Sequence, residues 1–189
     1  MVKINKVTTK TGDDGSSKIK KNKISKDDAM FSILGDFDEL NASIAHCISL
    51  NKKERKANKL LFQLQNKLFD IGAEFLSNNN FSKQRYRLGL EEIEWLEKIN
   101  NELIKKLQPV DSFIIPSGSP QVTYIHVTRT ICRRVERNLV NFYDKNNVKK
   151  NMHMLAFINR LSDFLFNLSR YLNRGKENKE HLWQINKKL

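Results

Sequence analysis

The chain has 189 residues, with 34 Lys and Arg against 21 Asp and Glu and a formal net charge of +13 at pH 7. This length predicts one domain whose core needs no disulfide, so Cys47 and Cys132 are expected to be reduced core residues. No run of about 18 apolar residues is present, which excludes a predicted membrane span. The N-terminus resembles neither a secretory signal nor an Arg-rich transit peptide. A cytoplasmic protein is therefore expected, or an organellar one from which a targeting peptide has been removed.

The excess of positive charge could indicate a nucleic-acid-binding protein. Many of the lysines, however, lie in Lys/Asn-rich stretches such as KIKKNKISK and NKKERKANK. Scattered lysines of this kind are typical of a biased surface composition. We therefore expect no nucleic-acid partner, and a basic helical binding module remains the alternative.

Only seven glycines and three prolines are present, which favours long helices with few tight turns. An extended N-terminal segment of about 25 residues comes first. Apolar residues then recur with helical spacing in five segments, which predicts an all-α, five-helix antiparallel bundle with ferritin-like up-down packing. The predicted helices cover 26–50, 53–76, 90–107, 121–143 and 150–173. The helical domain is expected over 26–174, followed by a basic C-terminal tail at 175–189. This tail is expected to be loose, although Leu182 and Trp183 could dock.

The N-terminal segment contains VTTKTGDDGSS, residues 7–17. Its two glycines, its hydroxyl groups and Lys10 are typical of a phosphate-binding loop, but Asp13 and Asp14 should repel phosphate and the order of a P-loop is missing. A calcium loop would need further acidic ligands where Ser16 and Lys18 stand. The segment alone is compatible with a nucleotide site or a tight turn.

The helix predicted at 121–143 places charged residues along the edge of its apolar stripe. One interpretation is a ladder of salt bridges along the helix, and the other is an anion clamp, because guanidinium groups match phosphate oxygens. The adjacent Arg134 is expected to point to the opposite, solvated side. The charged edge consists of Arg129, Arg133, Glu136 and Arg137.

Two further helices carry polar residues at or beside their apolar faces. Asp38 and Asn41 lie within the stripe of the first helix, and the fifth helix carries Asn159, Asp163 and Arg170 at its edge. A buried Asp needs a partner, and an arginine of the fourth helix, from this subunit or a neighbour, is the natural candidate. Three such helices predict a polar site built between them.

The stretch FIIPSGSP, residues 113–120, joins the third and fourth predicted helices. Phe113 could simply fill the core, or it could belong to a site. Ser117 or Ser119 can cap the following helix, whose free N–H groups favour anions.

Six blocks of this chain occur in the same order in a known family. Over about residues 7–173 the chain resembles the ATP:cob(I)alamin adenosyltransferases of the propanediol-utilisation type. The blocks are TKTGDDGSS, GDFDELNASI, LQNKLFDIGAEF, FIIPSGS, IHVTRTICRRVER and INRLSDFLFNLSRYLN.

The resemblance implies a homotrimer that binds ATP at its subunit interfaces and moves the 5′-deoxyadenosyl group of ATP onto the cobalt of cob(I)alamin. The products would be adenosylcobalamin and triphosphate, with Mg²⁺ as cofactor and a reductase supplying Co(I). A non-catalytic cobalamin chaperone or sensor is the alternative within this family.

The resemblance also implies roles for single residues. Residues 1–25 would be a nucleotide-binding segment in which Asp13 orders the loop or a magnesium-bound water, while Asp14 faces solvent. The residues folded over the triphosphate would be Thr9, Lys10, Thr11, Gly12, Asp13, Gly15 and Ser17, with Lys26 helping to hold the nucleotide.

In the helices, the resemblance implies that Arg129 pairs with Asp38 across subunits. The catalytic residues that it implies are Asp38, Phe113, Arg129 and Arg133. Phe113 would displace the lower axial ligand of the corrinoid, with Pro116 in the same corrinoid-binding loop. Glu136 would be the magnesium ligand. Contacts with nucleotide or metal are implied for Arg133, Glu136, Arg137 and Asn159. Ser117 and Lys10 depart from the family pattern, which commonly has glycine and arginine at these positions.

Overall fold

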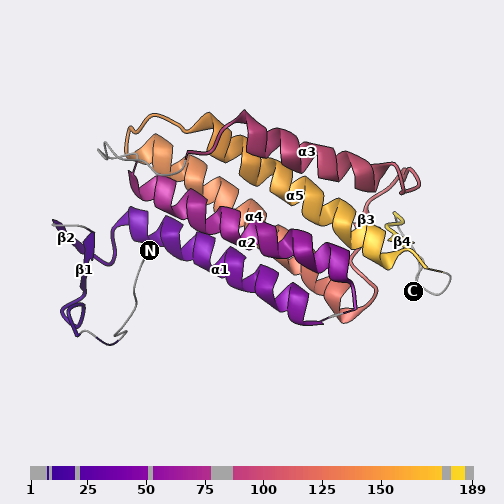
Figure 1. Ribbon diagram of the computed structural model, residues 1–189, viewed down its shortest axis with the longest axis horizontal. Helices are drawn as coiled ribbons and strands as arrows, with labels where there is room; N and C mark the ends of the chain where they lie inside the picture. The colour runs from indigo at the N-terminus through magenta and orange to yellow at the C-terminus, as the bar shows by residue number, and fades with distance from the viewer. Residues whose placement is uncertain are drawn as a thin grey trace.

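The computed structural model describes residues 8, 10–19, 22–50, 53–77, 87–175 and 180–185. Five α-helices form an antiparallel bundle, which confirms the predicted fold class (Figure 1). Each helix packs beside its neighbour in the spatial order α2, α1, α4, α5, α3. The helices are α1 (Ala29–Leu50), α2 (Arg55–Ser77), α3 (Leu90–Ile104), α4 (Pro120–Lys145) and α5 (Met152–Asn173).

Local sequence signals explain where the helices begin. Ser119 caps α4, where its side chain accepts a hydrogen bond from the Val122 N–H, and Pro120 takes the first helical position, where its missing N–H costs nothing. Asn151 caps α5 in the same way by accepting from the Met154 N–H at 3.1 Å. Of the two serines proposed as caps for α4, Ser119 fills this role.

The core consists of the apolar stripes of the five helices and includes both cysteines. Cys47 and Cys132 are buried and free, as predicted. Burial raises the pKa of the Cys47 thiol, which keeps it in the neutral form expected of a core residue. None of the described helices is long and apolar enough to cross a lipid bilayer.

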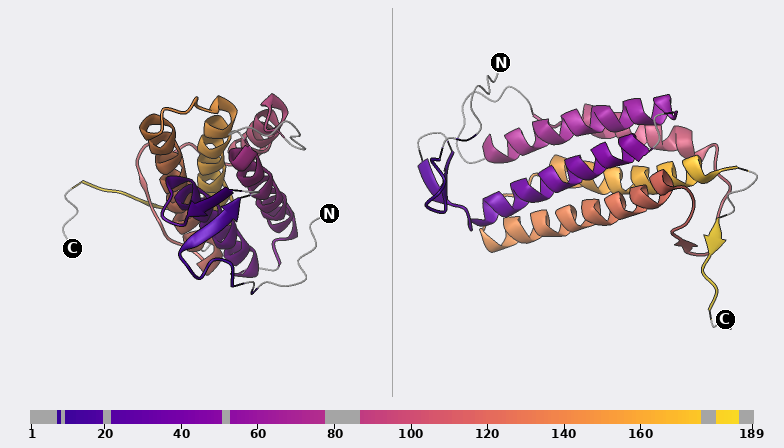
Figure 2. Two further views of the ribbon diagram at one scale, coloured as in Figure 1. Left: turned by 90° about the vertical axis from the view of Figure 1, so that its left-hand side faces the viewer. Right: turned by 90° about the horizontal axis from the view of Figure 1, so that it is seen from below.

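Two small antiparallel sheets, which the helical periodicity did not predict, lie at opposite ends of the bundle (Figure 2). Strands β1 (Ser16–Ile19) and β2 (Asn22–Ser25) form a hairpin just before α1. Strands β3 (Ile114–Ile115) and β4 (His181–Leu182) pair the loop before α4 with the C-terminal tail. Leu182 and Trp183 therefore dock, as the sequence allowed.

Candidate active site

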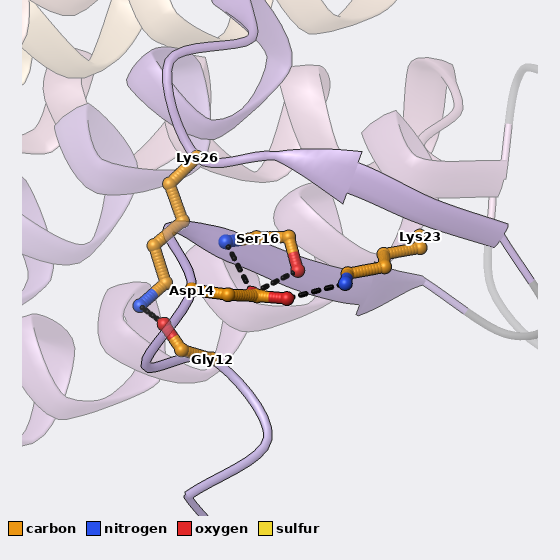
Figure 3. A network of polar contacts seen from close by, with 5 residues as sticks. All are labelled: Gly12, Asp14, Ser16, Lys23 and Lys26. Carbon is orange, nitrogen blue, oxygen red and sulfur yellow. Dashed lines mark hydrogen bonds and ion pairs between the residues drawn. The ribbon is translucent and has the colours of Figure 1, made fainter.

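The glycine-containing loop folds into a turn that leads into the β1–β2 hairpin (Figure 3). The Gly15 N–H donates to the Gly12 carbonyl at 3.3 Å, and the Lys26 N–H donates to the Gly15 carbonyl at 2.9 Å. The Lys26 ammonium also donates to the Gly12 carbonyl at 2.8 Å. These bonds join the turn at Gly12 and Gly15 to Lys26, just before the start of α1.

Glycine is required at position 12 because the chain comes too close there for a side chain. A Cβ added to Gly12 would lie 2.9 Å from the Ser16 carbonyl oxygen and 3.0 Å from the Lys26 ammonium. Gly15 has a φ of 79°, a conformation that is open to glycine at no steric cost. Two backbone amides of this turn, those of Gly15 and Ser16, already donate inside the loop, and these bonds together with the two glycines fix its shape.

The two aspartates of the loop differ in their contacts. Asp14 is exposed, as predicted, yet its carboxylate accepts hydrogen bonds from the N–H and hydroxyl of Ser16 and forms an ion pair with Lys23. Asp13 is also exposed and forms no hydrogen bond with the other described residues. The ordering contacts expected of Asp13 are thus found at Asp14.

The remaining predicted loop residues lie on the same segment. Lys10 is exposed and has a positive φ of 59°, Thr11 is exposed, and Ser17 lies half-buried in β1 opposite Ile24. Thr9 lies outside the described residues.

The arginines at the edge of α4 form no salt-bridge ladder. Within the described ranges, neither Arg129, Arg133 nor Arg137 makes an ion pair with a carboxylate. Arg133 and Arg137 are exposed, whereas Arg129 is half-buried with its guanidinium 5.3 Å from the centre of the Phe166 ring. The salt-bridge interpretation is therefore wrong, and the guanidinium groups remain available for an anion.

Arg129, Arg133 and Arg137 form a row along α4, here called the arginine row, and the charges around it agree with an anion site. Burial lowers the pKa of Arg129 from its usual value, and the neighbouring positive charge of Arg133 lowers it further. Arg134, one residue further, lies on the other side of α4 and forms an ion pair with Glu39 of α1. Asp163 acts in the opposite direction on the pKa of Arg129, yet Arg129, Arg133 and Arg137 make no ion pair in the described ranges, so these guanidinium groups are not neutralised by direct contact.

Glu136 is held by α5 and not by the arginines of its own helix. Its carboxylate accepts a hydrogen bond from the Asn159 amide at 2.8 Å. The side-chain oxygen of Asn159 in turn accepts from Arg160 at 3.1 Å, and Arg160 donates to Glu97 of α3 at 2.7 Å. The structure thus brings the predicted residues Glu136 and Asn159 together and fixes both side chains across α4 and α5.

Asp38 is not buried in the protomer, which corrects the prediction from the apolar stripe. It is exposed and lines a groove of about 500 Å³ between α1 and α2, beside Phe31 and Phe69. Asn41 is buried and exchanges hydrogen bonds with Gln65 of α2. Asp38 makes no ion pair with any described arginine, so the structure does not bring it together with the predicted residues of α4 and α5.

Phe113 does not fill the core, because its side chain is 79% exposed at the end of the bundle opposite the hairpin. The C-terminal tail holds its backbone: the Trp183 N–H donates to the Phe113 carbonyl at 2.7 Å, and the Ser112 hydroxyl donates to the Trp183 carbonyl at 2.8 Å. The rings of Phe113 and Trp183 meet edge to face with centroids 6.2 Å apart. Phe113 and Trp183 thus form an exposed aromatic pair on a backbone held by the tail.

A buried ion pair fixes the tail in this position. Arg170 of α5 is 8% exposed and donates to Glu180 at 2.8 Å and to the Gln108 carbonyl at 2.7 Å. Sequence reasoning placed Arg170 on the polar edge of α5 but did not find Glu180 as its partner. The ion pair therefore links α5 and the loop after α3 to the tail.

The turn between Phe113 and α4 tolerates only glycine at position 118. Gly118 has a φ of 115°, and an added Cβ would lie 2.2 Å from the side-chain oxygen of Asn173. Ser117, the departure from the family pattern, has a buried hydroxyl without a hydrogen-bond partner among the described residues. Pro116 is exposed beside it. The serine therefore fits the turn, but its hydroxyl adds no contact to it.

A helical bundle with a glycine turn, an exposed aromatic pair and a row of arginines that make no ion pair in the described ranges is compatible with the class of proteins that bind a polyphosphate. Comparison with known proteins agrees with this class. The family described as cobalamin adenosyltransferase matches residues 7–172, and the chain belongs to that family.

Individual relatives match over nearly their whole length. The chain is 31% identical to a corrinoid adenosyltransferase of Mycobacterium leprae, covering 93% of this chain and 95% of the relative. It is 32% identical to the corrinoid adenosyltransferase MMAB of Bos taurus, and this match covers 97% of this chain and 78% of the relative.

Solved structures agree with the fold as well. Two variants of a PduO-type ATP:corrinoid adenosyltransferase from Lactobacillus reuteri, one complexed with ATP and the other with cobalamin and ATP, each superpose with a TM-score of 0.84 at 30% identity. The match to the first covers 94% of this chain and 100% of the solved structure. The match to the second covers 95% of this chain and 97% of the solved structure.

Proposed function

We propose that this protein transfers the 5′-deoxyadenosyl group of ATP to the cobalt of cob(I)alamin. The lone pair of Co(I) attacks C5′ and forms the cobalt–carbon bond, while the bond from C5′ to the triphosphate oxygen breaks and the oxygen keeps its electron pair. Cobalt is formally oxidised to Co(III), and triphosphate leaves. Because Co(I) is itself the nucleophile, the protein needs no general base and contributes by orientation and charge.

The observation that carries this proposal is the arginine row of α4, which has no acidic partner among the described residues. Arg133 and Arg137 would neutralise the charge that develops on the leaving triphosphate. Lys10, Thr11, Ser17 and the amides around Gly12 would hold the triphosphate from the hairpin side, with Lys26 closing the turn.

Glu136 fits the role of a magnesium ligand. Mg²⁺ is usually held by one or two carboxylates together with substrate phosphates, and Glu136 is a carboxylate fixed by the Asn159 amide beside the arginine row. No cluster of three or more His, Cys, Asp or Glu side chains that could hold a metal by itself is found in the described parts of the chain. When bound, the ion would supply further neutralisation of the triphosphate charge.

The assembly that fits this site is a homotrimer. Asp38 opens to the groove between α1 and α2, whereas Arg129 lies against Phe166 of α5, on the far side of the α1–α4 pair. Since Asp38 and Arg129 make no ion pair within the described chain, their pairing in this proposal would form between protomers. ATP would bind at this interface, and a separate reductase would supply Co(I).

The proposed activity is tested with purified protein, Mg-ATP and chemically reduced cob(I)alamin. We expect the absorption spectrum of adenosylcobalamin to appear together with an equal amount of triphosphate, measured by ion-exchange chromatography. If the protein binds both ligands but forms no cobalt–carbon bond, even in a single turnover, the enzyme proposal is wrong and a chaperone or sensor role takes its place.

Phe113→Ala is expected to remove the four-coordinate Co(II) signal that forms with cob(II)alamin and ATP. The exposed ring would exclude the lower axial ligand, and losing its contact surface should slow adenosylation from Co(II) about tenfold or more. The signal is measured by electron paramagnetic resonance. Phe62→Ala is the matched control, because Phe62 is 63% exposed on α2, a helix that contributes no residue to the predicted site. An unchanged signal in Phe113→Ala would remove Phe113 from the corrinoid site.

A further inference from the structure

The carboxylate of Asp14 connects the glycine turn to the β1–β2 hairpin (Figure 3). One of its oxygens accepts from the Ser16 N–H at 3.1 Å and from the Ser16 hydroxyl at 2.6 Å. The other oxygen faces the ammonium group of Lys23 on β2. A single side chain thus links the residue that begins β1 with the opposite strand.

The charge of Asp14 also offsets a repulsion within the hairpin. Lys18 of β1 and Lys23 of β2 are direct partners in the register, and like charges at opposed positions destabilise a strand pair. The ion pair to Asp14 compensates the Lys23 charge. Lys23 and Ser16 hold the pKa of the Asp14 carboxyl well below its usual range, so this carboxylate remains ionised throughout the neutral range.

The turn that Asp14 closes contains the groups assigned to the triphosphate. Asp14 lies between Gly12 and Gly15, and Lys26 holds the Gly12 carbonyl from the other end of the hairpin. Two side chains, Asp14 and Lys26, therefore fix the same short turn from two directions. Lys26 belongs to the proposed ATP site, whereas Asp14 points toward the hairpin.

We infer that Asp14 is a positioning residue: by holding Ser16 and Lys23 it keeps the turn at 12–15 in the shape that receives the triphosphate of ATP. This inference rests on the proposed function of the loop. Asp14 does not touch the nucleotide in this account, so its removal acts on ATP binding through the backbone of the turn. The KM for cob(I)alamin is expected to be unaffected, because Asp14 contacts Ser16 and Lys23 and not the proposed corrinoid loop with Phe113 and Pro116.

The test measures KM for ATP and for cob(I)alamin separately in the full-length protein. Asp14→Ala is expected to raise KM for ATP about fivefold, because it removes one ion pair and two hydrogen bonds, while KM for cob(I)alamin and the melting temperature stay unchanged. Asp14→Asn, which retains an acceptor for Ser16, should have a smaller effect. Asp144→Ala is the matched control, because Asp144 forms a similarly exposed ion pair with Lys150 between α4 and α5.

A double-mutant cycle separates this role from direct phosphate binding by Lys23. If Lys23 acts through Asp14, the double variant with both residues changed to alanine has the same KM for ATP as Asp14→Ala. If Lys23 binds phosphate itself, the two effects multiply, and the inference is overturned.

Lys26→Ala distinguishes failure of this inference from failure of the loop assignment. A raised KM for ATP in Lys26→Ala with an unchanged value in Asp14→Ala would overturn the positioning role and leave the ATP loop in place. An unchanged KM for ATP in both variants would overturn the positioning role of Asp14 and the assignment of the loop to ATP. A fall in melting temperature with equal changes in both KM values would show that Asp14 serves only stability.

Discussion

Arg133→Ala is expected to slow the formation of adenosylcobalamin by about 10²- to 10³-fold, the usual cost of removing one preorganised charged donor from a transition state. Arg133 is exposed on α4 without an acidic partner among the described residues, so its guanidinium is free to meet the triphosphate. The measurement is the rate of cobalt–carbon bond formation at saturating Mg-ATP and cob(I)alamin.

Arg134→Ala is the matched control for Arg133→Ala. Arg134 is the same residue type on the same helix, but its guanidinium pairs with Glu39 on the side of α1. Arg134→Ala should leave the rate within about twofold of wild type, as expected for an exposed ion pair. The rate of Arg133→Lys should lie between the rates of Arg133→Ala and wild type, because lysine keeps the charge but cannot form the bidentate contact of a guanidinium group. Equal losses in Arg133→Ala and Arg134→Ala would indicate damage to α4 and not the loss of a site residue.

The helices could be predicted because their stabilisation is local in sequence. Apolar spacing and caps such as Ser119 fix where α4 begins, and the predicted helix ends differ from the observed ones by a few residues at most. The pairing of β3 with β4 could not be predicted in this way. It joins residues about 70 positions apart through backbone hydrogen bonds, which leave no periodic pattern in the sequence. The tail is also held by the ion pair from Arg170 of α5 to Glu180, which has no periodic signal either.

The candidate site was predictable in its residue types but not in its geometry. Arginines at the edge of an apolar stripe indicated a site, and the structure shows that they lack acidic partners within the described ranges. Asp38 lies among apolar neighbours in the sequence, which predicted burial, yet it is exposed in a groove with Phe31 and Phe69. Part of the apolar stripe of α1 stays open in this groove, and apolar spacing in the sequence does not distinguish the open part from the buried part.

This open groove leads to the second prediction, that two inactive variants restore activity when they assemble together. Each proposed site takes Asp38 from one protomer and the arginine row from the next. A protomer with Arg133→Ala keeps an intact Asp38 face, and a protomer with Asp38→Ala keeps an intact arginine row. In a mixed trimer of a closed ring, one of the three interfaces combines the two intact faces, so about a third of wild-type activity should return.

The experiment co-expresses the two variants with different affinity tags and purifies the mixed species through both tags in turn. Each variant alone, purified in the same way, provides the baseline, and size-exclusion chromatography verifies the assembly. Asp38→Asn replaces Asp38→Ala if the alanine variant does not assemble, because asparagine keeps the shape of the side chain and removes its charge. A mixed trimer as inactive as its parents would place the whole site within one protomer. Recovered activity could arise only between subunits, because no chain in the mixture carries both intact faces.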